Sequence, residues 1–488
     1  TSWTTSATLV VNATDNVGIK EYSFDDGTTW QTGNSKKFTS NGTIKIKVKD
    51  TSDNISTTTV VITKVDSIVP TISINSGTKT VDENISATDN IYTLVTGESG
   101  GTVNCLNNTT KESVTTYDTL RLGLNNVTCT ATSGTGKTAS ATGNITLNQV
   151  FIGQSGNRTS NYILYGTTSM SNGDIQYGPY RPATKGRYKI TYTGQGFGIG
   201  NQYVDSYQHR DPGISFSTLN VSYSNSNIVY YIDVEENLWG LETRLTALNS
   251  IKIENLKIEY VGELIKYVDN GLVVHYDGYN RPSNNTWSDL SGKGNNGVLT
   301  GFSSLDGSEY NSVYFNGSNY ITGVNNNPLY SESNKLPNMT VEIIFKKTTS
   351  SWGNIISFNH VVNEKSYMDL WTTLTSDSRG YQVNYIYKHN VADYSYTLGW
   401  GSYPLGSIVK ISYSKNENVY KTYVNGKEVD SKTLNNLTGF DINSFKIGAA
   451  ENGYNFTGHV YSVRVYNRAL TANEINNNNI VDKYRFGI

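Results

Sequence analysis

The sequence has little charge, little cysteine and little histidine. Charged residues make up 16% of its 488 residues, the net charge is −2, and there are only two cysteines and five histidines. A chain without a strong positive field does not attract polyphosphate, so we predict no nucleic-acid partner. No apolar run approaches the roughly 18 residues that a membrane-spanning helix requires, so we also predict no membrane insertion.

Sequence motifs of catalysis are also missing. The motifs HExxH, GxSxG, CxxC and the P-loop do not occur, and no two histidines have the helical spacing of a zinc site. Glycosidases built on sandwich folds use two facing carboxylates, and Glu342 and Asp369 are the pair that could take this arrangement. The acid pattern E-x-D-x-x-E of such enzymes does not occur. We therefore predict a protein that is not an enzyme.

The residues that are abundant indicate an all-β protein. The chain has 45 glycines and 36 tyrosines, and its Val, Ile and Tyr residues alternate with polar ones, as at 7–13 and 44–49. A length of 488 residues exceeds that of single all-β domains, which rarely pass about 250 residues. We therefore predict tandem β-sandwiches, in four modules at 1–66, 67–148, 149–262 and 263–488.

Both cysteines, Cys105 and Cys129, fall within the second module. We predict that they form a disulfide, which indicates an oxidising and therefore extracellular compartment. The alternative is a pair of free buried thiols.

Two modules at the start resemble spacer domains of bacterial surface proteins. Motifs at 13–19, 23–30 and 48–54 resemble the bacterial Ig-like repeats, and the stretch 120–132 resembles the hyalin-repeat branch of Ig-like folds. These resemblances imply a stalk of two sandwiches that serves in spacing or adhesion.

The two later modules resemble ligand-binding sandwiches. Motifs at 177–180, 186–193 and 251–260 resemble the jelly-roll modules that accompany carbohydrate-active and surface proteins. Motifs at 271–277, 287–297, 314–321, 423–429 and 458–470 follow one another in the order of the laminin-G-like, concanavalin A-like family. Two local features support this part of the sequence: Asn425 and Gly426 predict a two-residue hairpin turn, and Thr471 with Glu474 predicts a capping box at a helix start.

Aromatic side chains that stack on sugar rings are the candidate ligand contacts. In the fourth module they are Trp371, Tyr385, Tyr387, Tyr396, Trp400 and Tyr403, and in the third they are Tyr177, Tyr180 and Trp239. Further candidates for the third module's groove are Arg181, Tyr207, His209, Glu242 and Arg244. The alternatives are core or cross-strand packing for the aromatics and a structural ion pair for Glu242 and Arg244.

Calcium is the cofactor that the sequence leaves open, and no other cofactor is predicted. Concanavalin-type sandwiches often hold one ion through carboxylates, and Asp277, Asp289 and Asp306 are the candidate ligands. Ordinary turn capping by the same residues is the alternative.

The sequence as a whole therefore predicts that this chain is an extracellular, secreted or cell-surface attachment region. Its partners would be glycans or glycoproteins of a host or cell surface, bound by the C-terminal sandwiches. We expect any export signal, anchor or catalytic domain to lie in upstream domains of a longer chain. Two alternatives are the accessory C-terminal region of a larger secreted peptidase or glycosidase, and a structural component of a surface layer or phage tail.

Overall fold

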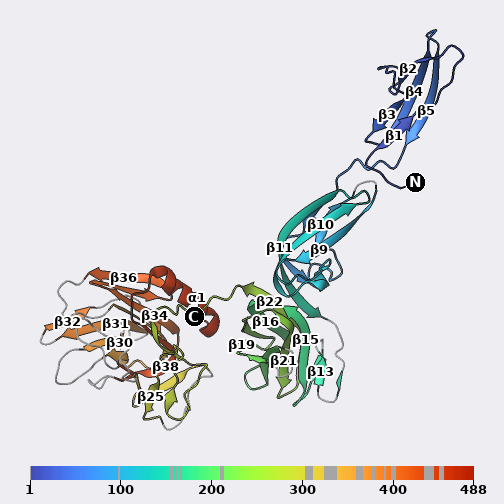
Figure 1. The fold of residues 1–488 in the computed structure, drawn as a ribbon. Helices are drawn as coiled ribbons and strands as arrows, with labels where there is room; N and C mark the ends of the chain where they lie inside the picture. Colours follow the sequence, from blue (N-terminus) through green and yellow to red (C-terminus); the bar gives the residue numbers. More distant parts are fainter. Residues whose placement is uncertain are drawn as a thin grey trace. The chain divides into compact units, whose positions relative to one another are not determined.

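A computed structural model describes most of the chain. The described residues are 2–96, 99–152, 158–159, 162–164, 168–208, 214–302, 311–323, 338–358, 367–374, 380–389, 392–396, 403–433, 445–449 and 455–488, with the backbone alone at 152, 158–159, 162, 164, 367–374, 380–389 and 392–396. The chain divides into two compact units, Thr1–Leu264 and Ile265–Ile488. The described part consists almost wholly of strands with one α-helix, which confirms the predicted all-β chain of tandem β-sandwiches (Figure 1).

The first unit begins with a small module of two sheets. Its strands are β1 (Ala7–Val10), β2 (Ile19–Ser23), β3 (Ser35–Phe38), β4 (Gly42–Asp50) and β5 (Ile55–Ile62). Strands β1 and β3 form one sheet, and β2, β4 and β5 form the other. Phe24, Ile46, Ile62 and Val65 are its buried apolar residues, so this module has a small core.

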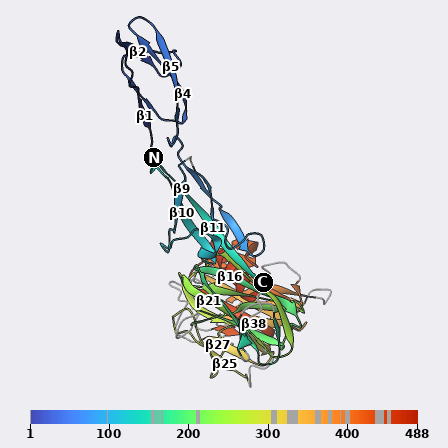
Figure 2. The same ribbon diagram turned by 90° about the vertical axis from the view of Figure 1, so that its right-hand side faces the viewer.

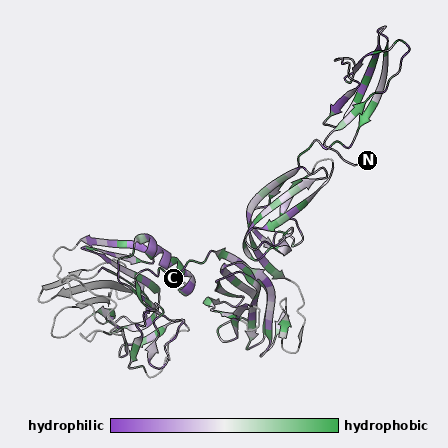
Figure 3. Cartoon of the chain, viewed as in Figure 1, coloured by the Kyte–Doolittle hydropathy of each residue, from purple (hydrophilic) through white to green (hydrophobic). Residues whose placement is uncertain are grey.

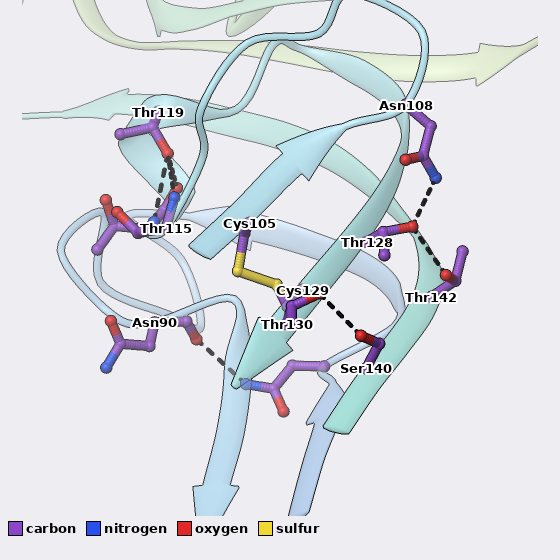
Figure 4. Close-up of a disulfide and its surroundings, with 12 residues drawn as sticks. Asn90, Cys105, Asn108, Thr115, Thr119, Thr128, Cys129, Thr130, Ser140 and Thr142 are labelled. Atoms are coloured by element: carbon purple, nitrogen blue, oxygen red, sulfur yellow. Dashed lines mark hydrogen bonds between the residues drawn. A yellow bond between two sulfur atoms is a disulfide. The ribbon is translucent and has the colours of Figure 1, made fainter. Parts of the chain in front are cut away.

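A disulfide lies in the core of the second module. The elements here are β6 (Thr71–Ile74), β7 (Gly77–Val81), β8 (Tyr92–Val95), β9 (Gly101–Asn107), the 3-10 helix η1 (Tyr117–Thr119), β10 (Gly123–Ser133) and β11 (Thr138–Ile152). Cys105 and Cys129 are directly opposite on β9 and β10, fully buried and bonded to each other (Figure 4). The disulfide prediction is therefore confirmed. Hydroxyl pairs such as Thr128–Thr142 link β10 to the next strand, β11.

Strand β11 continues from the second module into the third. It pairs with β10 as far as Leu147, and residues 149–152 then pair with strand β22 (Ile251–Gly262). Figures 1 and 2 show β9, β10 and β11 side by side. The predicted boundary between residues 148 and 149 therefore falls inside one continuous strand. Leu122 adds a second link, since its N–H donates to Pro182 O and its carbonyl accepts from Thr184 N, each over 2.8 Å.

Two facing sheets form the third module. Besides β22, its strands are β12 (Arg158–Thr159), β13 (Tyr162–Leu164), β14 (Thr168–Met170), β15 (Ile175–Ala183), β16 (Gly186–Gln195), β17 (Gln202–Gln208), β18 (Ile214–Phe216), β19 (Leu219–Tyr223), β20 (Asn227–Val234) and β21 (Leu238–Ala247). A nine-stranded sheet, which includes β9 to β11, contributes the buried Tyr188 and Tyr230, and the six-stranded sheet β12-β13-β15-β21-β17-β18 contributes Val204, Leu241 and Leu245. These apolar faces pack together as one core.

The second unit is a larger sandwich with a C-terminal helix. Its elements are β23 (Leu272–Asp277), β24 (Thr286–Trp287), β25 (Gly297–Thr300), β26 (Val313–Asn316), β27 (Tyr320–Gly323), β28 (Met339–Lys347), β29 (Gly353–Phe358), β30 (Tyr367–Leu374), β31 (Gly380–His389), β32 (Ala392–Tyr396), β33 (Tyr403–Pro404), β34 (Ile408–Asn416), β35 (Val419–Val424), β36 (Lys427–Thr433), β37 (Phe445–Ile447), β38 (Thr457–Tyr466) and α1 (Ala472–Phe486). A seven-stranded sheet built on β28 and β38 faces a nine-stranded sheet that contains β27, β29 and β37. Ile343 and Phe345 from the first sheet and Ile321 and Ile447 from the second share the core.

Both local predictions for this unit are confirmed. Asn425 and Gly426 join β35 to β36 with positive φ angles of 47° and 81°, which a two-residue hairpin turn of type I′ requires. Thr471 caps α1 and accepts a hydrogen bond from the N–H of Glu474, whose carboxylate in turn accepts from the N–H of Thr471.

Buried charges attach α1 to the seven-stranded sheet. The helix is largely hydrophilic (Figure 3), and its Asp482 contacts Arg464 and Lys410, with Nζ of Lys410 at 2.7 Å. Glu342 of β28 lies between the same two cations, each at 2.9 Å. The side chains of all four residues are at most 1% exposed. Burial alone would raise the pKa values of Glu342 and Asp482, but Lys410 and Arg464 lower them below their usual range.

The disulfide predicts a measurable loss of stability on its removal. Replacing both Cys105 and Cys129 with Ala should lower the free energy of unfolding by about 3 kcal/mol, because the unfolded chain regains the entropy of an open loop. Denaturant unfolding of the full chain measures this loss. Thr130→Ala, on the same strand but facing outward, is the control and should change little. An unchanged unfolding midpoint in the double variant would contradict the prediction.

The buried charges also predict a loss of stability when one of them is removed. Glu342→Gln should destabilise the second unit by about 3–5 kcal/mol at pH 7, because it leaves buried cations without full compensation. Calorimetry of the full chain measures the resulting decrease in the unfolding temperature. Since the folded-state pKa of Glu342 is lowered, its stabilisation is present above the unfolded pKa and is lost as the pH falls through the folded value, so the difference should shrink in acid. Lys421→Ala breaks the exposed pair with Glu428 and should cost at most about 1 kcal/mol; equal effects of the two variants would refute the prediction.

Candidate ligand-binding face

Strands β15, β21 and β17 of the third module are neighbours in the six-stranded sheet. Side chains alternate between the two faces of a strand, and Leu241, Leu245 and Val204 point into the core. Glu242 and Arg244 of β21 therefore lie on the outer face. By register, Tyr177 of β15 and Asp205 of β17 flank Arg244 on either side.

Seven residues of this outer side form a cluster that we call the tyrosine face. They are Tyr177, Tyr180, Tyr203, Asp205, Tyr207, Glu242 and Arg244. At its centre, Nε of Arg244 donates to Oε1 of Glu242 over 2.7 Å. The guanidinium of Arg244 lies over the ring of Tyr207, 4.2 Å from the ring centroid, a cation–π geometry. The structural ion pair that the sequence left as an alternative is thus present, and it lies within the aromatic cluster.

Asp205 has a carboxylate oxygen without a hydrogen-bond donor in the part of the chain that the structure describes. Its Oδ2 accepts from the hydroxyl of Tyr207 over 3.1 Å. Its Oδ1 is buried, and no donor among the described residues reaches it. Burial raises the pKa of Asp205, with Glu242 adding to the rise and Tyr207 and Arg244 opposing it. Buried polar atoms are nearly always satisfied in folded proteins, so this acceptor requires an explanation.

Tyr177 and Tyr180 provide a second pair of rings. Their centroids are 6.0 Å apart, and the rings are tilted by 58°. Burial, together with the charge of Glu242, raises the pKa of Tyr180 to about 12. The φ angle of Tyr180 is 62°, a left-handed conformation that is unfavourable for a bulky residue and that concentrates at ligand-binding positions.

The structure brings together most of the residues predicted for the third module. Tyr177, Tyr180, Tyr207, Glu242 and Arg244 share the tyrosine face, and His209 lies outside the described residues. Two other candidates are elsewhere. The guanidinium of Arg181 donates to the carbonyls of Asp118 and Leu120 in the second module. Trp239, 75% exposed, lies at the start of β21 with the guanidinium of Arg121 5.1 Å from its ring centroid.

Sequence reasoning missed Asp205 and Tyr203. The alternation of residues 202–208, in which Tyr203, Asp205 and Tyr207 occupy one face of a strand, was the available signal. That pattern alone does not reveal that β17 is the neighbour of β21.

The aromatic candidates of the fourth module lie on strands whose register is described. Tyr385 and Tyr387 are opposite Leu370 and Met368 of β30, which are in turn opposite the core residues Ile356 and Phe358 of β29. The register thus assigns both tyrosines, and Tyr396 opposite Tyr385, to the core-side face of the sheet.

Trp371 is opposite Asn384 and belongs to the other face. Tyr403 is partly buried and packs against the core. Trp400 lies outside the described residues, as do the side chains of Trp371, Tyr385, Tyr387 and Tyr396. Their roles as ligand contacts remain predictions.

Two of the three calcium candidates have protein partners. Asp277 is buried and accepts two hydrogen bonds from Arg485, at 2.7 and 3.2 Å. Burial would raise the pKa of Asp277, but Arg485 and His275 hold it well below the usual range. Asp289 accepts from backbone N–H groups, including those of His275 and Ser291, as turn capping requires. Asp306 lies outside the described residues, within which no three His, Cys, Asp or Glu side chains could hold a metal ion.

Glu342 and Asp369 do not form a catalytic pair. Glu342 lies beneath α1 on the outer side of the seven-stranded sheet, in contact with Arg464 and Lys410. Asp369 pairs with Ser357 in the nine-stranded sheet. By register this pair belongs to the outer face of the sheet, whereas Ile356 and Phe358 belong to the core face. The core of the sandwich therefore separates the two positions.

The second unit has the fold of a known class of lectins and glucanases. The family described as the concanavalin A-like lectin/glucanases superfamily matches residues 315–476, about one third of the chain. The C-terminal module is accordingly a concanavalin A-like domain. No curated protein matches the chain. Within the described residues, no helix is long and apolar enough to cross a bilayer.

Several solved structures show weak similarity. Domain 4 of AbnA, an extracellular arabinanase of Geobacillus stearothermophilus solved with arabinotriose, is 22% identical, with a TM-score of 0.31 over 42% of this chain and 96% of that domain. The receptor-binding domain of a botulinum neurotoxin C/D mosaic is 16% identical, with a TM-score of 0.31 over 44% of this chain and 52% of that one. The CBM40 module of a Ruminococcus gnavus sialidase, bound to α2,3-sialyllactose, is 19% identical, with a TM-score of 0.25 over 29% of this chain and 82% of that one. At such scores these similarities carry no argument about function.

Proposed function

We propose that this chain is a non-catalytic, extracellular attachment region that binds glycans. The observation that carries the proposal is the tyrosine face, where aromatic rings adjoin hydrogen-bonding groups on the outer side of a rigid sheet. Sugar recognition combines these two elements, since rings pack on the C–H faces of a pyranose while polar groups bond its hydroxyls.

Other features support the proposal less directly. The buried disulfide suits an oxidising, extracytoplasmic compartment. The concanavalin A-like superfamily contains lectins. The C-terminal module would therefore carry a second glycan site, and Trp371, which the strand register assigns to the outer face of its sheet, is the candidate contact. The Ig-like and hyalin-repeat resemblances assign the first two modules to a stalk. Glu342, a candidate catalytic acid, is held in a structural charge network, which favours binding over hydrolysis.

A glycan array with the full 488-residue chain tests the proposal. We expect binding to one group of related glycans, and Tyr207→Ala and Tyr177→Ala should each weaken it about tenfold, because each removes an apolar ring surface. Trp371→Ala, tested in parallel, shows whether the fourth module binds independently.

Trp239→Ala is the matched control. It removes a large, mostly exposed aromatic side chain of the same sheet outside the tyrosine face, so glycan binding should be unchanged. Circular dichroism of each variant verifies the fold. If no glycan binds, or if the Trp239 variant alone loses binding, the tyrosine face is not the glycan site.

A further inference from the structure

We propose that Asp205 and Arg244 bind two adjacent hydroxyl groups of a neutral sugar, a vicinal diol, with the ring of Tyr207 beside them. This inference rests on the proposed function and specifies the ligand chemistry of the same face. A hydroxyl group both donates and accepts hydrogen bonds, so two adjacent hydroxyls match a free acceptor next to a free donor.

The acceptor is Oδ1 of Asp205, which is buried and without a donor among the described residues. Its partner atom Oδ2 is already bonded to the hydroxyl of Tyr207, which fixes the orientation of the carboxylate. A ligand hydroxyl that donates to Oδ1 would satisfy a buried acceptor that has no donor among the described residues. Sites built in this way discriminate strongly against analogues that lack the hydroxyl.

The donor is the guanidinium of Arg244. Nε is committed to Glu242 and the guanidinium plane lies over Tyr207, so the side chain is held in one position. Its terminal nitrogens Nη1 and Nη2 have no acceptor among the described residues, and the side chain is 39% exposed. Asp205 and Arg244 are directly opposite on adjacent strands, where Cβ atoms lie about 4.5–5.5 Å apart.

The charge of the face favours a neutral ligand. Arg244 is paired with Glu242, which leaves the carboxylate of Asp205 as the uncompensated charge of the cluster. A carboxylate or sulfate on the ligand would be placed next to it in a partly desolvated site, where repulsion between like charges is strong. The face therefore selects uncharged sugars over uronic or sialic acids.

Calorimetric titration of the full chain tests this inference. The probes are neutral oligosaccharides, namely arabinotriose, xylotriose, cellotriose and lactose, together with the C6-carboxylate form of cellotriose and α2,3-sialyllactose as the anionic counterparts. At least one neutral sugar should bind, about tenfold or more tighter than its anionic counterpart. Asp205→Asn should weaken binding of that neutral sugar about tenfold, because the amide is a poorer acceptor than the carboxylate. Glu254→Gln, on the opposite sheet, should leave it unchanged.

The outcomes separate the two proposals. Tighter binding of an anionic sugar that Tyr207→Ala abolishes would overturn the diol inference and keep the glycan site. An Asp205→Asn variant with undiminished affinity would also overturn the diol inference alone. Absence of binding by every probe here and every glycan of the array would overturn the proposed function itself.

Discussion

The second unit depends on four buried charges beneath its C-terminal helix. Helix α1 packs Ile475 and Phe486 into apolar clusters with residues of the seven-stranded sheet. Beside them Asp482 enters the interior with Arg464 and Lys410 as partners, and Glu342 completes the balance. Two carboxylates and two cations leave no net charge, which offsets the cost of taking each from water. The helix lies on the outer side of β28 and β38, and its residues are not part of the main core between the two sheets.

In the first unit the corresponding constraint is a strand. Because β11 pairs with β10 and then with β22, a hinge between the second and third modules would have to break ladder hydrogen bonds. The hydrogen bonds of Leu122 and the buried Arg121, which donates to the carbonyl of Leu238, add links outside the ladder. The disulfide lies on strands of the same sheet, so the tyrosine face belongs to a module anchored to a covalently stabilised neighbour.

Local features were predictable from the sequence, and long-range ones were not. The Asn425-Gly426 turn, the Thr471–Glu474 capping box and the all-β class follow from residue types at short spacing. Glu342 was a candidate catalytic acid because its partners, Lys410 and Arg464, are distant in the chain and nothing in the sequence around Glu342 indicates them. The tyrosine face was predicted in part: its members on β15 and β21 and Tyr207 of β17 were named, but Asp205 and Tyr203 were not, because the position of β17 beside β21 is a property of strand order. Strand order leaves no trace in the spacing of residues.

Lys347 and Asp205 are two of the buried polar groups that lack hydrogen-bond partners among the described residues, and their surroundings differ. Lys347 follows Phe345 on the core side of β28, its ammonium is buried 5.5 Å from the ring centroid of Phe456, and burial lowers its pKa to about 8. With this pKa the buried ammonium loses its proton more readily than an exposed lysine does, as apolar surroundings require. At Asp205 burial likewise favours the uncharged form and raises the pKa, while Tyr207 and Arg244 oppose this rise. Asp205 is only partly buried and lies on an outer face, so its unpaired Oδ1 lies near the surface where the proposed sugar would bind, whereas Lys347 faces the core.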